Sequence, residues 1–144
     1  MPSSRARHAL PTLKWVQKLE QPVRVLIVDD QEPFRSVARA VVESTEGFEV
    51  AGEAETGSGS VDAARLLKPD LVLLDVNLPD FSGVEAARQI LAEQPQVAIV
   101  LVSTYEADEY SPRAAEVGAV YLPKSEFGPE RLAATWAEAT AASA

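Results

Sequence analysis

Several polar residues lie shortly after runs of apolar residues, and together they could transfer a phosphoryl group to a carboxylate. Three are aspartates, whose carboxylates repel one another unless one is protonated or a cation lies between them. Oxygen ligands without histidine or cysteine nearby favour a hard cation, Mg²⁺ or Mn²⁺. A lysine supplies a point charge for a phosphoryl oxygen, and a hydroxyl can donate a hydrogen bond to the same group. The residues are Asp29 and Asp30, Asp75 and Asn77, Ser103 and Thr104, and Lys124.

The apolar runs that precede these residues predict the strands of a sheet. Val23–Val28, Leu71–Leu74 and Val97–Val102 are almost continuously apolar, as in strands that are covered on both faces. Shorter runs predict two more strands, at Phe48–Ala51 and Val120–Leu122.

Helices are predicted between these strands from apolar residues at helical spacing and from proline and glycine at the ends. In the first helix, Phe34, Val37, Ala38 and Val41 form one apolar stripe. We expect Gly52–Ser60 to be a loop. The remaining predicted helices are Val61–Lys68, Gly83–Gln94, one that begins with Ser111 as N-cap and Pro112 in its first turn and ends at Gly118, and Pro129–Ala142 with Leu132, Trp136 and Ala139 facing inward.

Five strands that alternate with five helices predict an α/β fold, a three-layer doubly wound parallel sheet. Ligands bind such folds outside the carboxyl ends of the strands, where the polar residues lie. Each of these residues has an ordinary explanation when taken alone, because an aspartate after a strand is often a turn former or a helix cap. Their joint placement after four strands is what indicates a site.

The same motifs resemble the receiver domain of bacterial two-component response regulators, over roughly residues 22–140. Asp29-Asp30 matches the acidic pair of that family, and Asp75–Gly83 (DVNLPDFSG) matches its phosphoacceptor turn. Ser103, Tyr121 and Lys124 fall at its hydroxyl, aromatic and lysine positions. The resemblance implies a flavodoxin-like fold with five parallel strands.

The resemblance also implies roles for the individual residues. Asp75 would accept a phosphoryl group from a sensor histidine kinase or a histidine phosphotransfer protein. Asp30, Asp75 and the backbone carbonyl of Asn77 would hold Mg²⁺, with Asp29 acting mainly through water. Lys124 would pair with the phosphoryl group, to which Ser103, beside Thr104, would move.

Tyr121 would then repack inward and change the face made by the fourth helix, fifth strand and fifth helix, where a downstream protein binds. This mechanism is a population shift between two packings. The segment between Gly118 and Tyr121 is one residue shorter than the family pattern, which could alter the travel of Tyr121.

Three functions remain open at this stage. The first is a stand-alone phosphoacceptor switch, not an enzyme, whose phosphorylation and dephosphorylation are self-catalysed; it could form a homodimer. The second is the receiver part of a longer DNA-binding regulator, because Asp29–Arg35 (DDQEPFR) and Ser103–Tyr110 (STYEADEY) most resemble the subfamily with a helix-turn-helix output domain. The third is a small-molecule phosphatase with an aspartate nucleophile, which Asn77 disfavours because a general-acid carboxylate is missing there.

Composition bounds these choices. The chain has 144 residues, 47% of them hydrophobic, enough for one domain with a core. Its net charge of −9 disfavours direct binding of nucleic acid. Cysteine is absent, which excludes disulfides and thiol chemistry. No apolar run is long enough to cross a membrane, and no secretory signal follows Arg5 and Arg7, so we expect a cytoplasmic protein.

The expected organisation is an N-terminal extension at residues 1–21, the receiver domain at 22–140 and a C-terminal tail at 141–144. In the extension, Trp15, Val16 and Leu19 fall at helical spacing. A short amphipathic helix that docks on a partner is one interpretation. A frayed tail, or a start codon placed too far upstream, is the other.

Overall fold

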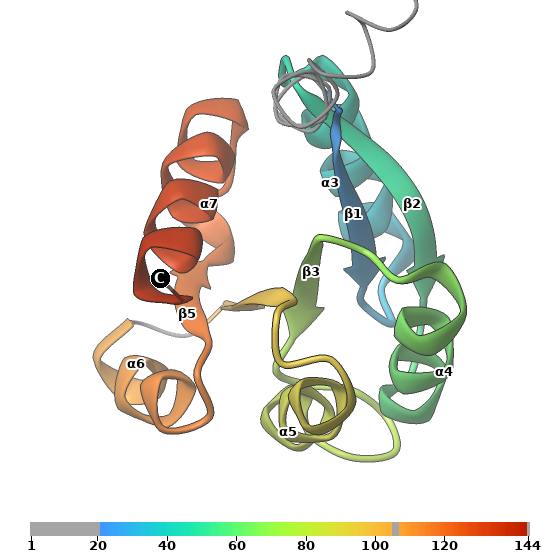
Figure 1. The fold of residues 1–144 in the computed structure, drawn as a ribbon, viewed down its shortest axis with the longest axis vertical. Coiled ribbons are helices and arrows are strands. Elements are labelled where there is room, and N and C mark those ends of the chain that lie inside the picture. Colours follow the sequence, from blue (N-terminus) through green and yellow to red (C-terminus); the bar gives the residue numbers. More distant parts are fainter. Residues whose placement is uncertain (1–20, 105–106, 144) are drawn as a thin grey trace, which may run out of the picture.

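The computed structural model describes residues 21–104 and 107–143, and its centre is a single parallel sheet (Figure 1). The strand order is β2-β1-β3-β4-β5, and every pairing is parallel. The strands are β1 (Val23–Val28), β2 (Phe48–Ala54), β3 (Leu71–Asp75), β4 (Ala98–Ser103) and β5 (Val120–Pro123). The five-stranded doubly wound sheet predicted from the sequence is confirmed.

Helices cover both faces of this sheet, which is why its three central strands are buried along most of their length. In Figure 1, α3 and α7 lie on one side and α4, α5 and α6 on the other. The bounds are α3 (Glu32–Ser44), α4 (Gly57–Leu67), α5 (Gly83–Glu93), α6 (Ala107–Glu116), a 3₁₀ turn η1 (Lys124–Glu126) and α7 (Pro129–Ser143).

Alternate residues of each strand enter two separate hydrophobic clusters, as the period of two in a strand requires. Leu26 and Leu74 pack in the cluster under α4, α5 and α6. Ile27 and Leu73 pack in the cluster under α3 and α7. The two layers together fix the carboxyl ends of β1 and β3 side by side.

The β2–α4 region differs from the prediction. The strand predicted to end at Ala51 continues to Ala54, and the expected loop Gly52–Ser60 contains the first turn of α4. The helix begins early because the Thr56 side chain accepts a hydrogen bond from the Gly59 amide at 2.8 Å, an N-cap that satisfies one free amide of the first turn. The predicted loop is wrong.

Helix α6 also begins earlier than predicted. Ser111 is not its N-cap and Pro112 is not in its first turn, because the helix runs from Ala107 to Glu116 with Pro112 inside. Inside the helix Pro112 removes one backbone hydrogen bond and crowds the carbonyl four residues earlier. The first turn lies ahead of it and forms without the Pro112 amide. The end at Gly118 is supported by its positive φ of 84°, which suits glycine after a helix.

The inward face of α3 is rotated from the predicted stripe. Val37 is 54% exposed, whereas Ala38 and Val42 are buried. Phe34 and Val41 pack at the edge of the core. The face on the sheet therefore follows the i, i+4, i+8 row through Phe34, Ala38 and Val42, which leaves Val37 on the solvent side.

The other element predictions agree with the structure to within one or two residues. In α7, Leu132 and Ala139 are buried as expected, and half-buried Trp136 packs edge-on against Phe48 at 6.4 Å between ring centroids. The amphipathic helix predicted around Trp15 lies outside the described residues. Among the described residues, no helix combines the length and apolarity needed to span a bilayer.

Candidate functional site

The strand order reverses at β1, which is flanked by β2 and β3, so this is the position where ligands bind a doubly wound fold. Asp29 directly follows β1, Asp75 ends β3, Ser103 ends β4 and Lys124 directly follows β5. The parallel strands bring these sequence-distant residues to one edge of the sheet.

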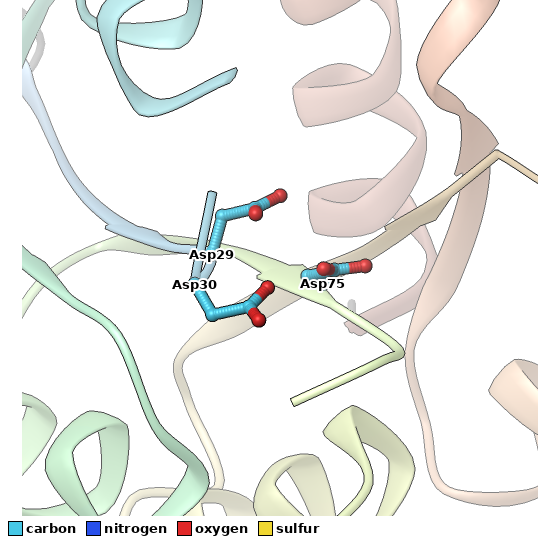
Figure 2. Close-up of side chains that lie close together, drawn as sticks. All are labelled: Asp29, Asp30 and Asp75. Atoms are coloured by element: carbon cyan, nitrogen blue, oxygen red, sulfur yellow. The ribbon is translucent and has the colours of Figure 1, made fainter. Parts of the chain in front are cut away.

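Three carboxylates converge at this edge (Figure 2). One carboxylate oxygen from each of Asp29, Asp30 and Asp75 lies within 4.8 Å of the other two. Asp29 is fully buried and Asp75 is 4% exposed, whereas Asp30 is half-buried. The turn after β1 holds the pair in place, because the Gln31 backbone amide donates to Asp29 Oδ1 at 2.8 Å.

Lys124 is the cation that faces this cluster. Its Nζ lies 2.7 Å from Asp29 Oδ2 and 3.6 Å from Asp75 Oδ2. The same ammonium lies 4.4 Å from the centroid of the Phe34 ring, and that ring packs against Phe127 at 5.8 Å between centroids. A cation over an aromatic face is attracted by the ring quadrupole, so Phe34 and the two carboxylates hold Lys124 from different sides.

Burial and a neighbouring negative charge raise the pKa of Asp75 to about 6. Burial is the largest cause and the Asp29 charge adds to it, while the Lys124 charge and the Asn77 backbone amide, 3.3 Å from Asp75 Oδ1, act in the opposite direction. The charged form of Asp75 is therefore destabilised even with Lys124 nearby, and additional positive charge would stabilise it.

The donor set fits a hard divalent cation. All three side chains offer oxygen atoms, the ligand type preferred by Mg²⁺. The buried Asp29 Oδ2 already contacts the Lys124 ammonium at 2.7 Å. One lysine charge faces three carboxylates, so the cluster keeps excess negative charge that a divalent cation would offset.

The turn after Asp75 depends on Gly83, at the start of α5. The Gly83 amide donates to the Val76 carbonyl at 2.8 Å. A Cβ at Gly83 would lie 2.1 Å from the Asp75 carbonyl oxygen, closer than real side chains approach backbone. Only a residue without a side chain lets helix α5 begin against the end of β3.

The remaining predicted residues lie at the same end of the sheet in different environments. Ser103 is fully buried, whereas Thr104 and Asn77 are exposed. Tyr121 is 8% exposed and belongs to the hydrophobic cluster under α4, α5 and α6. In this structure Tyr121 is therefore already packed inward.

Sequence reasoning missed Arg35, which supports the acidic pair from behind. Its Nη1 donates to the Asp29 backbone carbonyl at 2.7 Å, and its Nε pairs with Glu53 at 3.2 Å. The signal available was its position in the first turns of α3, shortly after the acidic pair, which allows a long side chain to reach back.

The comparisons with known proteins agree with this geometry. Residues 25–136 match the family model described as the response regulator receiver domain. The chain is 38% identical over 103 residues to the response regulator GacA of Pseudomonas aeruginosa, covering 71% of this chain and 48% of GacA. It is 38% identical over 111 residues to the uncharacterized transcriptional regulatory protein YxjL of Bacillus subtilis, covering 76% of this chain and 50% of that protein.

Solved structures give the same result for the fold. A LuxR-family two-component response regulator from Aurantimonas has a TM-score of 0.76 at 28% identity, covering 84% of this chain and 86% of that one. The response regulator domain of Thermotoga maritima CheB has a TM-score of 0.74 at 28% identity, covering 84% and 98%.

A parallel five-stranded sheet with an acidic cluster and a lysine at its carboxyl edge is the arrangement expected of a phosphoacceptor signalling domain. The chain belongs to the response regulator receiver family. Phosphorylation of an aspartate is the general function of this family, and its members bind Mg²⁺ through acidic residues and partner with histidine kinases or phosphotransfer proteins. The chain spans about half the length of the relatives named above.

Proposed function

We propose that Asp75 accepts a phosphoryl group from the phosphohistidine of a sensor kinase or phosphotransfer protein. A carboxylate oxygen of Asp75 forms a bond to phosphorus while the phosphorus–nitrogen bond breaks, and the imidazole leaves with the electron pair. The product is an acyl phosphate. The observation that carries the proposal is the position of Asp75, buried at the end of β3 and 3.6 Å from the Lys124 ammonium.

The surrounding residues have separate tasks in this proposal. Asp29, Asp30 and Asp75, with the backbone carbonyl of Asn77, hold Mg²⁺, which when bound offsets the negative charge shared by carboxylates and phosphoryl oxygens. Lys124 pairs with a phosphoryl oxygen of the product, because its Nζ already lies next to Asp75. Ser103, with Thr104 beside it, donates a hydrogen bond to the same phosphoryl group.

The output surface in this proposal is formed by α6, β5 and α7. Tyr121 in β5 links the site to that surface, because it packs in the same cluster as Ala114 of α6. Movement of Ser103 toward the phosphoryl group biases the packing of Tyr121 and so the shape of the face that a downstream protein or a second copy binds.

The domain is proposed to act as a switch and not to turn over a separate substrate. The residue two positions after Asp75 is Asn77, which cannot serve as the general acid of an aspartate phosphatase. Another relative is a protein-glutamate methylesterase/protein-glutamine glutaminase of Alkalilimnicola ehrlichii, 36% identical over 112 residues, but the match covers only 27% of it. We place the receiver at residues 22–140 and its action in the cytoplasm.

A second arrangement is supported by the relatives. The chain covers about half of GacA and YxjL, and one similar structure is a LuxR-family regulator. This favours a receiver within a longer DNA-binding regulator over a stand-alone switch. An immunoblot of source cells decides, because a band near 15.5 kDa supports the stand-alone protein and a larger band supports the longer regulator.

The proposal is tested by intact mass spectrometry after incubation with acetyl phosphate. We expect wild type to gain about 80 Da, one phosphoryl group, only when Mg²⁺ is present. Asp75→Asn should gain nothing, and Asp62→Asn, an exposed aspartate of α4, should behave as wild type. Equal labelling of Asp75→Asn, or no labelling of wild type with this donor or a phosphohistidine donor, would overturn the proposal.

A further inference from the structure

Asp80, in the turn after the phosphoacceptor, binds the start of a helix that is distant in sequence. Its Oδ1 accepts from the Gly57 amide at 2.7 Å and its Oδ2 accepts from the Ser58 amide at 2.9 Å. These amides belong to the first turn of α4, where backbone donors have no partners within the helix. Asp80 therefore caps α4 from outside that helix.

Close packing also holds Asp80 and Phe81 against the start of α4. A Cβ at Gly57 would lie 2.5 Å from the Phe81 ring and 2.9 Å from Asp80 Oδ1, so a side chain at Gly57 would displace both neighbours. The Phe81 amide also donates to Asp80 Oδ1 at 2.9 Å. Hydrogen bonds from the Ser58, Gly57 and Phe81 amides lower the pKa of Asp80 to about 2, because donors that point at a carboxylate stabilise its charged form.

The same helix start is joined to the other half of the acidic cluster. The Asp29 backbone amide donates to the Ala54 carbonyl at 3.1 Å, and Ala54 is the last residue of β2, shortly before α4. Two hydrogen bonds and two short stretches of chain therefore connect Asp75 with Asp29. The chain leads from Asp75 to Asp80, which bonds to Gly57, and from Gly57 back to Ala54, which bonds to Asp29. The connection returns to Asp75 through the carboxylate cluster.

We propose that Asp80 is a positioning residue for the divalent cation, because it latches the turn that carries Asn77 to the segment that supports Asp29. This inference rests on the proposed function of the cluster. Asp80 touches neither the cluster nor the reacting atoms. Strands β1 and β3 pair directly up to Val28 and Leu74, so the effect of Asp80 is to hold the turn that carries Asn77 in place beside them. Groups that hydrogen-bond directly to metal ligands typically change metal affinity by 10- to 100-fold when removed. Asp80 acts one contact further away, so we expect an effect at the low end of that range.

The test compares variants that damage the same helix start in different ways, with Mg²⁺ titrated calorimetrically into the whole chain. Asp80→Ala removes the latch, and Gly57→Ala displaces it from the other side. Thr56→Ala is the matched control, since it removes the helix's own cap on Gly59 and leaves Asp80 in place. Thermal unfolding and circular dichroism of all three establish that they fold.

We expect Asp80→Ala and Gly57→Ala to raise the Kd for Mg²⁺ by about tenfold, and Thr56→Ala to change it by less than about twofold, at similar losses of thermal midpoint. Hydrogen exchange should show faster exchange of the Gly57 and Ser58 amides in Asp80→Ala without metal. Unchanged Mg²⁺ affinity in Asp80→Ala, or an equal loss in Thr56→Ala, would overturn the latch.

Failure of the latch is distinguishable from failure of the proposed function. The latch is judged by Mg²⁺ affinity and amide exchange, whereas the function of Asp75 is judged by phosphorylation of wild type. Wild type that binds Mg²⁺ but takes up no phosphoryl group contradicts the function alone. Wild type that binds no Mg²⁺ contradicts both.

Discussion

The charge of Asp75 destabilises the folded protein in the absence of metal. Burial and the Asp29 charge raise its pKa from the ordinary 3.8 to about 6, so the folded state holds the Asp75 proton more tightly than the unfolded chain does. Between about pH 4 and pH 6 the free energy of unfolding therefore falls as the pH rises, and above pH 6 the full cost is present.

We predict that Asp75→Asn raises the free energy of unfolding at pH 7 without Mg²⁺ by about 1 to 3 kcal/mol, since a shift of about two pKa units corresponds to roughly 3 kcal/mol. Urea unfolding at pH 4 and pH 7 measures this. The difference between the variant and wild type should shrink toward pH 4. A less stable variant at pH 7 would show that the Asp75 charge does not destabilise the folded protein.

A second prediction concerns the ring beneath Lys124. Phe34→Leu keeps an apolar side chain but removes the aromatic face 4.4 Å from the ammonium, and we expect phosphorylation by acetyl phosphate to slow by about two- to fivefold, the equivalent of about 0.5–1 kcal/mol. A time course of intact mass measures the rate.

Phe127→Leu is the matched control for this prediction, because it removes the other ring of the same aromatic pair while Phe34 stays beneath Lys124. We expect its rate to stay close to that of wild type. Equal slowing in both variants would assign the effect to packing of the two rings and not to Lys124.

At the scale of elements, the start of α5 limits how β3 can end. The Asp75 carbonyl oxygen would lie 2.1 Å from a Cβ at Gly83. Neither atom can rotate away, because the oxygen belongs to the backbone and a Cβ is bonded directly to it. Gly83→Ala must therefore push α5 away from β3. We predict a loss of about 1–3 kcal/mol in the free energy of unfolding, as overpacking typically causes, together with weaker Mg²⁺ binding.

Gly128→Ala provides the comparison, because nothing lies within 4 Å of a Cβ at that position. It should change stability by less than about 1 kcal/mol and leave Mg²⁺ affinity unchanged. Chemical denaturation of both variants measures the difference. A Gly83→Ala protein as stable as wild type would contradict the close approach of α5 to Asp75.

The sequence predicted best those elements that are buried on both faces, because burial leaves a continuous apolar run in the sequence. The apolar runs of β1, β3 and β4 are unambiguous because helices cover both faces. The start of α4 was not predictable from its own residues, since GEAETGSGS favours a loop and the turn is completed by Asp80 from the β3–α5 connection. Pro112 led to a wrong start for α6, because proline favours the first turn of a helix but lies inside this one.

The candidate site was predictable to a different extent. Residues that follow strands could be grouped by topology alone, which brought Asp29, Asp75 and Lys124 together on one edge. Side chains that support the site from helices or turns, such as Arg35, Phe34 and Asp80, could not be placed, because their contacts depend on the rotation of a helix or the path of a turn.

At the scale of the whole molecule, Mg²⁺ could be attracted either by the net charge of −9 or by the cluster of three carboxylates. We predict that Mg²⁺ raises the thermal midpoint of wild type by several degrees, since a ligand at a hundred times its Kd stabilises by about 2.7 kcal/mol. Differential scanning fluorimetry with Mg²⁺, and with NaCl at matched ionic strength, separates binding from screening.

Asp30→Ala is the variant that checks this prediction. It removes one of the three clustered carboxylates at a half-buried position, so the midpoint should respond little to Mg²⁺. The same rise in Asp30→Ala as in wild type would mean that the cation acts on the general negative charge of the surface and not at the cluster.

The strand order leaves β2 and β5 as the two borders of the sheet, where unpaired backbone groups invite another chain to add a strand. Each border is unsuited to that. Strand β2 exposes Glu49 and Glu53 and pairs with β1 in an irregular register, while β5 is only four residues long and ends at Pro123, which has no amide hydrogen to donate. Both edges therefore disfavour sheet extension between copies, so we expect this domain to stay free of fibres at high concentration.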